Sequence, residues 1–258
     1  MKPHSNADKA STAAAPPRSR GWSRIRRVAG VGAADLKAIR LFGEVAEDRL
    51  RQLADTASQK RLAARTLVIE EDERCDALYG LLEGTVEVFS RFDDQETVVD
   101  VAQPGAALLL LAVMTGLPYV ASARTLSSAR LLVIPAAAIR DLFDADKIFA
   151  RTVAHELSRA SYRMLLELKS LKLRTSMERL ADWLLRADAR SNGSQFKLPF
   201  GKRTLASRLG MTPECLSRSL RSLARHGVRV RGRNVTVEDR AALITIAGTA
   251  ALAEDIDL

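Results

Sequence analysis

The sequence predicts an α+β fold in which a β-roll, a long helix and a helix-turn-helix follow one another along the chain. Three patterns support this prediction. Short β-type runs separated by turn residues fill 62–134, a helical repeat fills 146–171, and two short helical patterns flank a glycine within 202–226. The chain has 258 residues, of which 47% are hydrophobic, and this allows one or two domains with a substantial core.

The N-terminal segment differs in composition from the rest of the chain. Residues 1–30 are rich in Ala, Ser, Pro and Arg, and they lack the apolar core of a signal peptide. Segments of this composition bury too little apolar surface to fold by themselves. We therefore expect residues 1–35 to form a disordered basic arm.

A helix followed by a β-roll is expected over residues 36–145. Leu41–Ser58 has helical periodicity through Val45, Leu50, Leu53 and Ala57. Turn signals such as Pro104-Gly105 then separate short runs of strand type, and closely spaced short strands are typical of an antiparallel roll or barrel. The expected strands are Thr66–Ile69, Leu78–Leu82, Thr85–Phe89, Thr97–Val101 and Arg130–Ile134.

A single long helix is expected over residues 146–172. Its apolar residues are spaced alternately four and three positions apart, which is the pattern of a coiled-coil seam. A helix so placed favours a homodimer, and a symmetric dimer reads a two-fold palindrome with half-sites about 10 bp apart. The alternative is a helix that packs on its own domain. The seam consists of Phe149, Val153, Leu157, Ala160, Met164, Leu168 and Leu171.

The pattern at 202–226 predicts a helix-turn-helix. Lys202–Leu209 is a short amphipathic helix, Gly210 supplies a permissive turn, and Thr212 with Pro213 begins a second helix that extends to about His226. The two faces of this helix differ, since one repeats leucine and the other is polar. The inward residues are Leu216, Leu220 and Leu223, and the polar residues are Glu214, Ser217, Arg218 and Arg221.

The polar face suits a recognition helix, because Arg can donate two hydrogen bonds to the O6 and N7 atoms of guanine and Glu can accept a hydrogen bond from the N4 amine of cytosine. The alternative is a solvated face on an ordinary helical hairpin. Charge supports the first interpretation: residues 172–233 contain 15 Lys and Arg against 4 Asp and Glu, a net charge of +11, whereas residues 41–171 have a net charge of −5. We therefore expect double-stranded DNA as the partner. In the arm, Arg24, Arg26 and Arg27 either contact its backbone or only solubilise the chain.

Several other classes of protein are disfavoured. The two cysteines, Cys75 and Cys215, are too few for a disulfide framework and lack the spacing of a zinc or iron–sulfur site, so no bound metal is expected. Because a disulfide framework is missing, a cytoplasmic location is the simplest expectation. The apolar stretch 106–121 is too short to span a bilayer, so no membrane partner is expected. The three histidines are scattered, and no nucleophile elbow, P-loop or paired catalytic carboxylate appears, so the chain is not expected to be an enzyme. A non-specific DNA-packaging protein remains an alternative, although it has no need of the acidic half.

The order of these parts resembles the CRP/FNR family of bacterial transcription regulators, over residues 40–247. The resemblance is carried by YGLLEGTVEVF (79–89), TPECLSRSL (212–220) and LARHGVRVRGRNVTVED (223–239). It implies a cyclic-nucleotide-binding-like β-roll sensor domain over 36–145, a dimerisation helix over 146–172, a winged helix-turn-helix over 173–247 and a C-terminal tail over 248–258. Val228–Val237 matches the wing hairpin, turning at Gly232.

The resemblance also implies how DNA is read. The E-x-x-S-R arrangement of Glu214, Ser217 and Arg218 is that of the FNR branch and implies a TTGA-type half-site, with Glu214 on cytosine, Arg218 on guanine and Ser217 against thymine. Further expected DNA contacts are Thr212, Lys202, Arg203, Arg221, Arg231 and Arg233, with Arg229 available for phosphate.

The turn Arg91–Gln95 matches the loop that family activators present to RNA polymerase. This match favours activation of transcription, and repression by occlusion of the promoter is the alternative.

The sensor half departs from its relatives. Cyclic-nucleotide binders need a Gly-Glu pair after the Pro-Gly turn and an Arg-Ser-Ala further along, but Leu109 with Leu110 and residues 119–121 (Tyr-Val-Ala) stand at those places. Arg124 lies several residues out of register. Cyclic AMP is therefore not expected as the effector. An iron–sulfur cluster is not expected either, since no cysteine cluster lies near the N-terminus.

Three hypotheses for the signal remain open, and the cofactor is unknown. In the first, Leu109, Leu110, Met114 and Tyr119 line a hydrophobic haem pocket of a nitric-oxide or redox gas sensor. The axial ligand of the haem iron is then Cys75, Met114 or His155. The alternative is that Met114 only packs in the core and that His155 is only a solvated side chain. In the second hypothesis no effector binds, and regulation follows the abundance of a preformed dimer. In the third, oxidation of Cys215 at the start of the recognition helix weakens DNA binding, with a small packing residue as the alternative.

Overall fold

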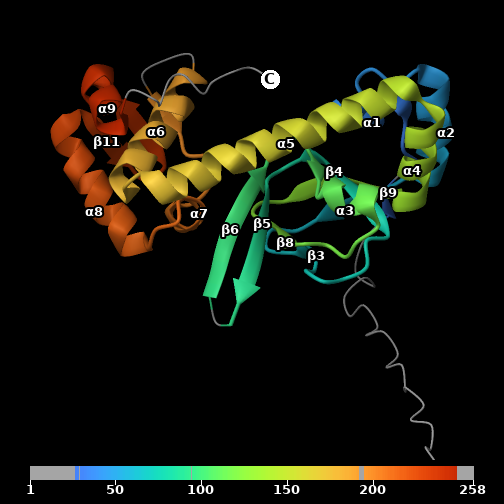
Figure 1. The fold of residues 1–258 in the computed structure, drawn as a ribbon, viewed down its shortest axis with the longest axis horizontal. Helices are drawn as coiled ribbons and strands as arrows, with labels where there is room; N and C mark the ends of the chain where they lie inside the picture. Colours follow the sequence, from blue (N-terminus) through green and yellow to red (C-terminus); the bar gives the residue numbers. More distant parts are fainter. Residues whose placement is uncertain (1–26, 29, 94, 192–194, 249–258) are drawn as a thin grey trace, which may run out of the picture.

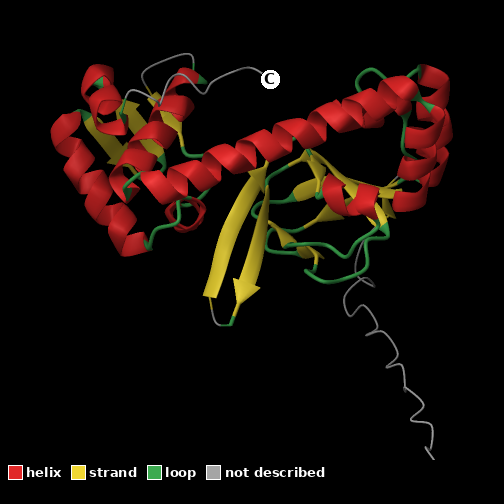
Figure 2. Cartoon of the chain, viewed as in Figure 1, coloured by secondary structure: helices red, strands yellow, loops and turns green. Residues whose placement is uncertain are grey.

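The computed structural model describes residues 27–28, 30–93, 95–191 and 195–248. Figures 1 and 2 show a β-roll that lies along one long helix and a small, mainly helical domain at the C-terminal end of that helix. The structure confirms the predicted α+β fold and the order of its parts.

Two antiparallel sheets form the roll. The first contains, in spatial order, β1 (Arg27–Val28), β2 (Ser58–Leu62), β9 (Ala129–Pro135), β4 (Ala77–Glu83) and β7 (Ala107–Leu108). The second contains β3 (Leu67–Ile69), β8 (Ser122–Thr125), β5 (Val86–Phe92) and β6 (Gln95–Ala102). Each of the five predicted runs overlaps a strand of the roll. The short polar strands β2 and β8 were not expected, because their residues show no alternation of apolar and polar side chains.

Short helices accompany these sheets. They are α1 (Ala33–Lys37), the 3-10 helix η2 (Arg40–Phe42), α2 (Glu47–Thr56), α3 (Leu110–Thr115) and α4 (Ala136–Ala145). The predicted helix Leu41–Ser58 is corrected in two places, since its first turn is the separate η2 and Ser58 already belongs to β2. The predicted disordered arm is corrected at its end, because β1 and α1 begin before residue 35. Residues 1–26 of the arm lie outside the described residues.

The long helix α5 (Lys147–Leu173) spans the molecule, as predicted (Figure 1). Its N-cap is Asp146, whose carboxylate accepts hydrogen bonds from the backbone N–H groups of Ile148 and Phe149. The ring of Phe149 stacks on Phe42 with centroids 5.6 Å apart and planes 5° apart, inside the core of the roll. The first part of the helix is thereby fixed to the β-roll.

The predicted seam of α5 divides into two parts. Phe149 and Val153 are buried in the roll, with 0% and 1% exposure, so the expectation that these two residues contribute to a dimer interface is wrong. Here the alternative of packing on the helix's own domain holds. Leu157 is half-buried against the same core, and its place in the interface stays a prediction. Ala160 is half-buried, and the remaining seam residues are exposed: Met164 by 67%, Leu168 by 49% and Leu171 by 50%. Only this second part of the helix presents an unpartnered apolar stripe.

The C-terminal domain has a core of its own. It consists of α6 (Ser176–Ala189), β10 (Gln195–Lys197), α7 (Lys202–Arg208), α8 (Pro213–Leu223), the 3-10 helix η3 (Ala224–His226), β11 (Val228–Arg231), β12 (Asn234–Val237) and α9 (Arg240–Ala247). Leucines at 184, 205, 216 and 243 meet in this core together with Val235. Strands β11 and β12 pair as a hairpin that turns at Gly232, at the place predicted for the wing. Except for Gly248, the C-terminal tail lies outside the described residues.

The two domains also touch directly, where α7 lies against β6. The hydroxyl of Ser207 accepts a hydrogen bond from the backbone N–H of Val98 at 2.8 Å. Arg208 donates to the carbonyl of Val99 at 2.9 Å and forms an ion pair with Asp100 at 2.7 Å. The first helix of the helix-turn-helix is therefore bonded to the edge of the sensor sheet.

We predict that Phe149→Ala lowers the free energy of unfolding of the roll by about 3–5 kcal/mol, because it removes a fully buried ring and leaves a cavity beside Phe42. Denaturant unfolding followed by circular dichroism measures this change. The matched control is Ile148→Ala, whose side chain is 59% exposed and which we expect to change stability by less than about 0.5 kcal/mol. Equal effects of the two substitutions would show that Phe149 does not anchor the helix.

Candidate nucleic-acid interface

The helix-turn-helix forms where its local signals place it. Gly210 follows α7 with a φ of +60°, in the left-handed region that glycine tolerates best. A Cβ at this position would lie 2.8 Å from the Cδ2 atom of Leu171, so α5 also crowds the turn. The hydroxyl of Thr212 accepts a hydrogen bond from the backbone N–H of Cys215 at 3.2 Å, and Pro213 begins α8.

Helix α8 has the two faces expected of it, with one difference. Leu216 and Leu223 are buried, but Leu220 is only half-buried and Ser219 is buried in the core-facing row. A serine on the buried side gives no hydrophobic signal, which is why the sequence pattern missed it. The opposite face is exposed along its whole length and carries the four predicted residues Glu214, Ser217, Arg218 and Arg221.

The exposed face offers hydrogen-bonding groups of both kinds. Interactions with its own backbone N–H and with the Thr212 hydroxyl hold the pKa of Glu214 below its usual value, so this carboxylate is an acceptor at neutral pH. The Ser217 hydroxyl donates to the carbonyl of Pro213 at 2.8 Å, and Arg221 donates to the carbonyl of Ser217. Arg218 is exposed and forms no hydrogen bond or ion pair of its own within the described part of the chain, although its charge also lowers the pKa of Glu214.

The other predicted DNA contacts fall into two groups. Thr212, Lys202 and Arg203 are exposed around the start of the two helices, and Arg231 is exposed in the wing. The remaining two are already engaged. Arg233 donates two hydrogen bonds to the carbonyl of Leu198, at 2.9 and 2.6 Å, which ties the wing to the segment before α7. Arg229 forms an ion pair with Glu238 at 2.6 Å.

Sequence reasoning missed Arg179, which holds the turn in place. This α6 residue donates to the carbonyls of Leu209 and Gly210, at 2.9 and 3.2 Å, and to the carbonyl of Arg174 at 2.6 Å. The first two carbonyls stand at the end of α7, where backbone acceptors have no partner within the helix. An arginine in an amphipathic helix gives no sequence signal for such a role, because its partners are backbone atoms about thirty residues away.

The redox candidate Cys215 is half-buried between α8 and α6. Its thiol donates a hydrogen bond to the hydroxyl of Ser176 at 3.4 Å. This position agrees with the alternative of a small packing residue. The redox hypothesis stays a prediction.

The four residues proposed to line an effector pocket pack with the core of the roll. Leu110 and Tyr119 are buried, and Leu109 and Met114 lie half-buried against the same core. The hydroxyl of Tyr119 donates to the carbonyl of Ala77, at 2.5 Å, and burial raises the pKa of this phenol above its usual value. The four residues do come together, but as part of the packed core.

The candidate axial ligands for haem occupy different surroundings. Cys75 is buried in the roll, where desolvation raises the pKa of its thiol, Met114 is half-buried, and His155 is exposed on α5. Within the described residues, no group of three or more His, Cys, Asp or Glu side chains is placed to hold a metal ion. A search of the described helices found none long and apolar enough to cross a membrane.

Comparison with known proteins gives matches to both halves of the chain. Residues 59–146 match the cyclic nucleotide-binding domain family, and residues 178–246 match the Crp-like helix-turn-helix domain family. The anaerobic regulatory protein of Pasteurella multocida is 24% identical over 215 residues, which cover 79% of this chain and 77% of that protein.

Two solved structures have the same fold. FixK2 from Bradyrhizobium japonicum is 20% identical, with a TM-score of 0.67 over 74% of this chain and 98% of that one. A CooA mutant from Carboxydothermus hydrogenoformans is 15% identical, with a TM-score of 0.68 over 82% of this chain and 95% of that one.

We predict that Arg179→Ala lowers the free energy of unfolding by about 1–3 kcal/mol, because it leaves carbonyl groups at the end of α7 without a donor. Denaturant unfolding of the full chain measures the effect. Arg225→Ala is the control, since this arginine is exposed on η3, and we expect a change below about 0.5 kcal/mol. If the two variants are equally stable, Arg179 does not support the turn.

Proposed function

Because the chain belongs to the CRP/FNR family of transcription regulators, we propose that it binds a TTGA-type palindrome as a homodimer and activates transcription without cyclic AMP. The observation that carries the proposal is the exposed face of α8, where an ionised acceptor and an exposed guanidinium stand one helical turn apart. Regulators of this kind act by binding, so no catalytic role is proposed.

Base reading is assigned to the first turns of α8. Glu214 accepts from the exocyclic amine of cytosine, and Arg218 donates to the O6 and N7 atoms of guanine. Ser217 lies between them on the same exposed face and contacts the methyl group of thymine. These three side chains match the half-site that the E-x-x-S-R arrangement implies.

Affinity for the DNA backbone is assigned to the cations around this face. Lys202, Arg203 and Arg221 are exposed on the two helices, and Arg231 extends the cationic surface into the wing. The exposed Thr212 hydroxyl stands at the helix N-terminus, where phosphate is favoured. These contacts position the protein on any sequence, whereas the base contacts select the site.

Dimerisation is assigned to the second half of α5. Met164, Leu168 and Leu171 form one stripe there, joined by Leu165, which is 64% exposed. Apolar side chains repeated along a helix and left exposed are the pattern that a coiled coil buries against a partner helix. A second copy of α5 is the simplest occupant, and it also supplies the two-fold symmetry that a palindrome requires.

Independence from cyclic AMP is supported by the roll. Arg124, the nearest arginine to the missing cassette, forms ion pairs with the buried carboxylate of Glu87 and with Glu96, and its guanidinium lies 4.2 Å from the ring centroid of Phe89. These contacts occupy the cation that a cyclic phosphate would need. At the cassette positions themselves stand the apolar Leu109 and Leu110 and the buried Tyr119.

Activation is assigned to the tip of the β5–β6 hairpin, which projects from the roll (Figure 1). Arg91 forms an ion pair with Glu96 beside this tip, at 3.0 Å, and Phe92 is 82% exposed. An exposed aromatic residue next to charged neighbours is suited to a protein contact. RNA polymerase is the proposed partner.

We predict that Arg218→Ala weakens binding to a TTGA-N6-TCAA palindrome by about 1–3 kcal/mol and has little effect on unrelated DNA, because the lost contact is to a base. Fluorescence anisotropy with both duplexes at one salt concentration measures the difference. Arg51→Ala on helix α2 is the control, since this arginine is exposed on the sensor domain. An equal loss on both duplexes would mean that Arg218 contacts only phosphate.

We predict that the double substitution Met164→Lys and Leu168→Lys converts the dimer to a monomer, because it places like charges on the stripe that the partner helix covers. Light scattering after gel filtration measures the mass. Ile148→Lys is the control, since it is an exposed apolar residue on the same helix outside the stripe. A double variant that retains the mass of the wild type would exclude this interface.

A further inference from the structure

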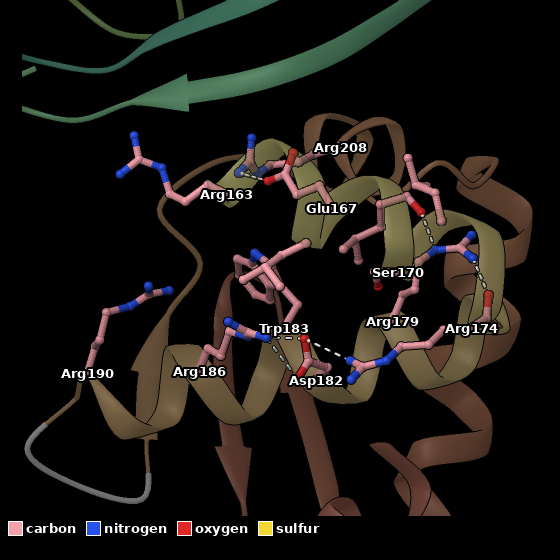
Figure 3. Close-up of a pocket in the computed structure, with 13 residues that line it drawn as sticks. Arg163, Glu167, Ser170, Arg174, Arg179, Asp182, Trp183, Arg186, Arg190 and Arg208 are labelled. Carbon is pink, nitrogen blue, oxygen red and sulfur yellow. Dashed lines mark hydrogen bonds and ion pairs between the residues drawn. The ribbon is translucent and has the colours of Figure 1, made fainter. Parts of the chain in front are cut away.

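A pocket lies between the second half of α5, helix α6 and helix α7 (Figure 3). Its cavity volume is about 260 Å³, which is slightly below the usual range for small-molecule sites, so a ligand larger than this extends out of its mouth. None of the DNA-reading residues of α8 lines it, and it lies outside the roll, where the family's cyclic-nucleotide site would be. We call it the arginine pocket, because six of its lining residues are Arg163, Arg174, Arg179, Arg186, Arg190 and Arg208.

The charge of the arginine pocket is strongly unbalanced. Among its lining residues, the acidic groups that face these arginines are Glu167 and Asp182. Asp182 pairs with Arg174 at 3.3 Å and with Arg186 at 3.0 Å. Among the residues that the structure describes, the lining therefore has more basic than acidic side chains, which favours an anionic occupant.

Two of the arginines, Arg163 on α5 and Arg190 at the end of α6, are exposed and form no side-chain hydrogen bond or ion pair within the residues that the structure describes. Burial raises the pKa of the Glu167 carboxyl, and the charge of Arg163 acts against this larger effect. Figure 3 shows Arg163 on α5, in the upper part of the view, and Arg190 and Arg186 on α6 below it, with the guanidinium of Arg163 pointing away from the other two. Each guanidinium group suits a phosphate, which it can bind through two parallel hydrogen bonds.

The rest of the lining is apolar and contains one aromatic ring. Trp183 is half-buried in the middle of the pocket, and its ring lies 5.9 Å from that of Phe200 at an angle of 56°. Leu166, Leu171 and Leu209 complete this part. An indole ring beside aliphatic side chains is suited to a planar aromatic ring, which it binds by stacking.

We propose that the arginine pocket is a binding site for a nucleotide, with its phosphates on Arg163, Arg190 and Arg186 and its base against Trp183. A phosphate and a planar ring in one ligand match the two parts of the lining. The exposed stripe of α5 adjoins the pocket: Leu171 belongs to the stripe and also lines the pocket, whereas Met164 and Leu168 do not line it. A partner helix on the stripe therefore borders the pocket at Leu171.

A bound nucleotide also reaches the contact between the two domains. Arg208 lines the pocket and forms ion pairs with Glu167 of α5 and with Asp100 of β6, each at 2.7 Å. A phosphate within reach of this guanidinium competes with both carboxylates. Binding in the pocket therefore weakens the bond between α7 and the sensor sheet, and it changes DNA affinity from a site outside the roll.

The test uses the full-length dimer with Trp22→Phe, which leaves Trp183 as its one tryptophan. The probes are GTP and ATP, with tripolyphosphate as an anion without a base and guanosine as a base without charge. We expect at least one of the two nucleotides to quench Trp183 saturably and to bind in calorimetry. Both partial probes should bind at least about tenfold more weakly than that nucleotide. Absence of saturable binding by both GTP and ATP would overturn the proposal, and equal binding of tripolyphosphate would overturn the role of the base.

The site is assigned by a matched pair of variants. Arg163→Gln with Arg190→Gln removes both unpaired cations and should raise the Kd of the nucleotide by roughly tenfold or more, while the protein keeps its fold by circular dichroism. Arg151→Gln removes an exposed arginine of α5 outside the pocket and should leave the Kd unchanged. If the double variant binds the nucleotide as tightly as this control, the nucleotide lies elsewhere and the assignment is wrong.

Discussion

The structure depends on the continuity of α5, because this one helix belongs to both domains. Its first turns are held in the roll by the stack of Phe149 on Phe42, and its last turn is crowded by Gly210 of the helix-turn-helix. A helix of 27 residues is about 40 Å long, and it transmits a tilt at one end as a displacement at the other. A change in packing near Phe149 would therefore displace the C-terminal domain without any contact to it.

The two domains that α5 connects also differ in net charge. The sensor half is acidic and the C-terminal half is basic, and the two meet where Arg208 pairs with Asp100 and Glu167. Next to this contact, the buried Glu87 pairs with Arg124 and lies 3.3 Å from the hydroxyl of Thr204 on α7. Opposite charges on the two halves thus stabilise the contact between α7 and the roll.

The sequence predicted those features whose cause is local. The cap at Thr212, the turn at Gly210 and the apolar period of α5 each depend on a few neighbouring residues, and the structure has all three. The apolar period of α5 could not show that its two halves face different surroundings, because periodicity identifies an apolar face and not what covers that face. Phe149 is buried in the core of the roll, whereas Met164 is exposed. The bonds of Arg179 and the clustering of the pocket arginines arise only from the meeting of distant segments. They could not be predicted from one chain without its fold.

The bonds between α7 and β6 have a consequence for the sheet itself. β6 is an edge strand, and its register with β5 is interrupted by a bulge at Val99, which leaves backbone groups of β6 without a partner strand. Ser207 and Arg208 satisfy two of these groups, at Val98 and Val99. These contacts cover an open strand edge of the kind to which another extended chain can add. The packing of α7 on β6 therefore protects the sheet against β-type self-association.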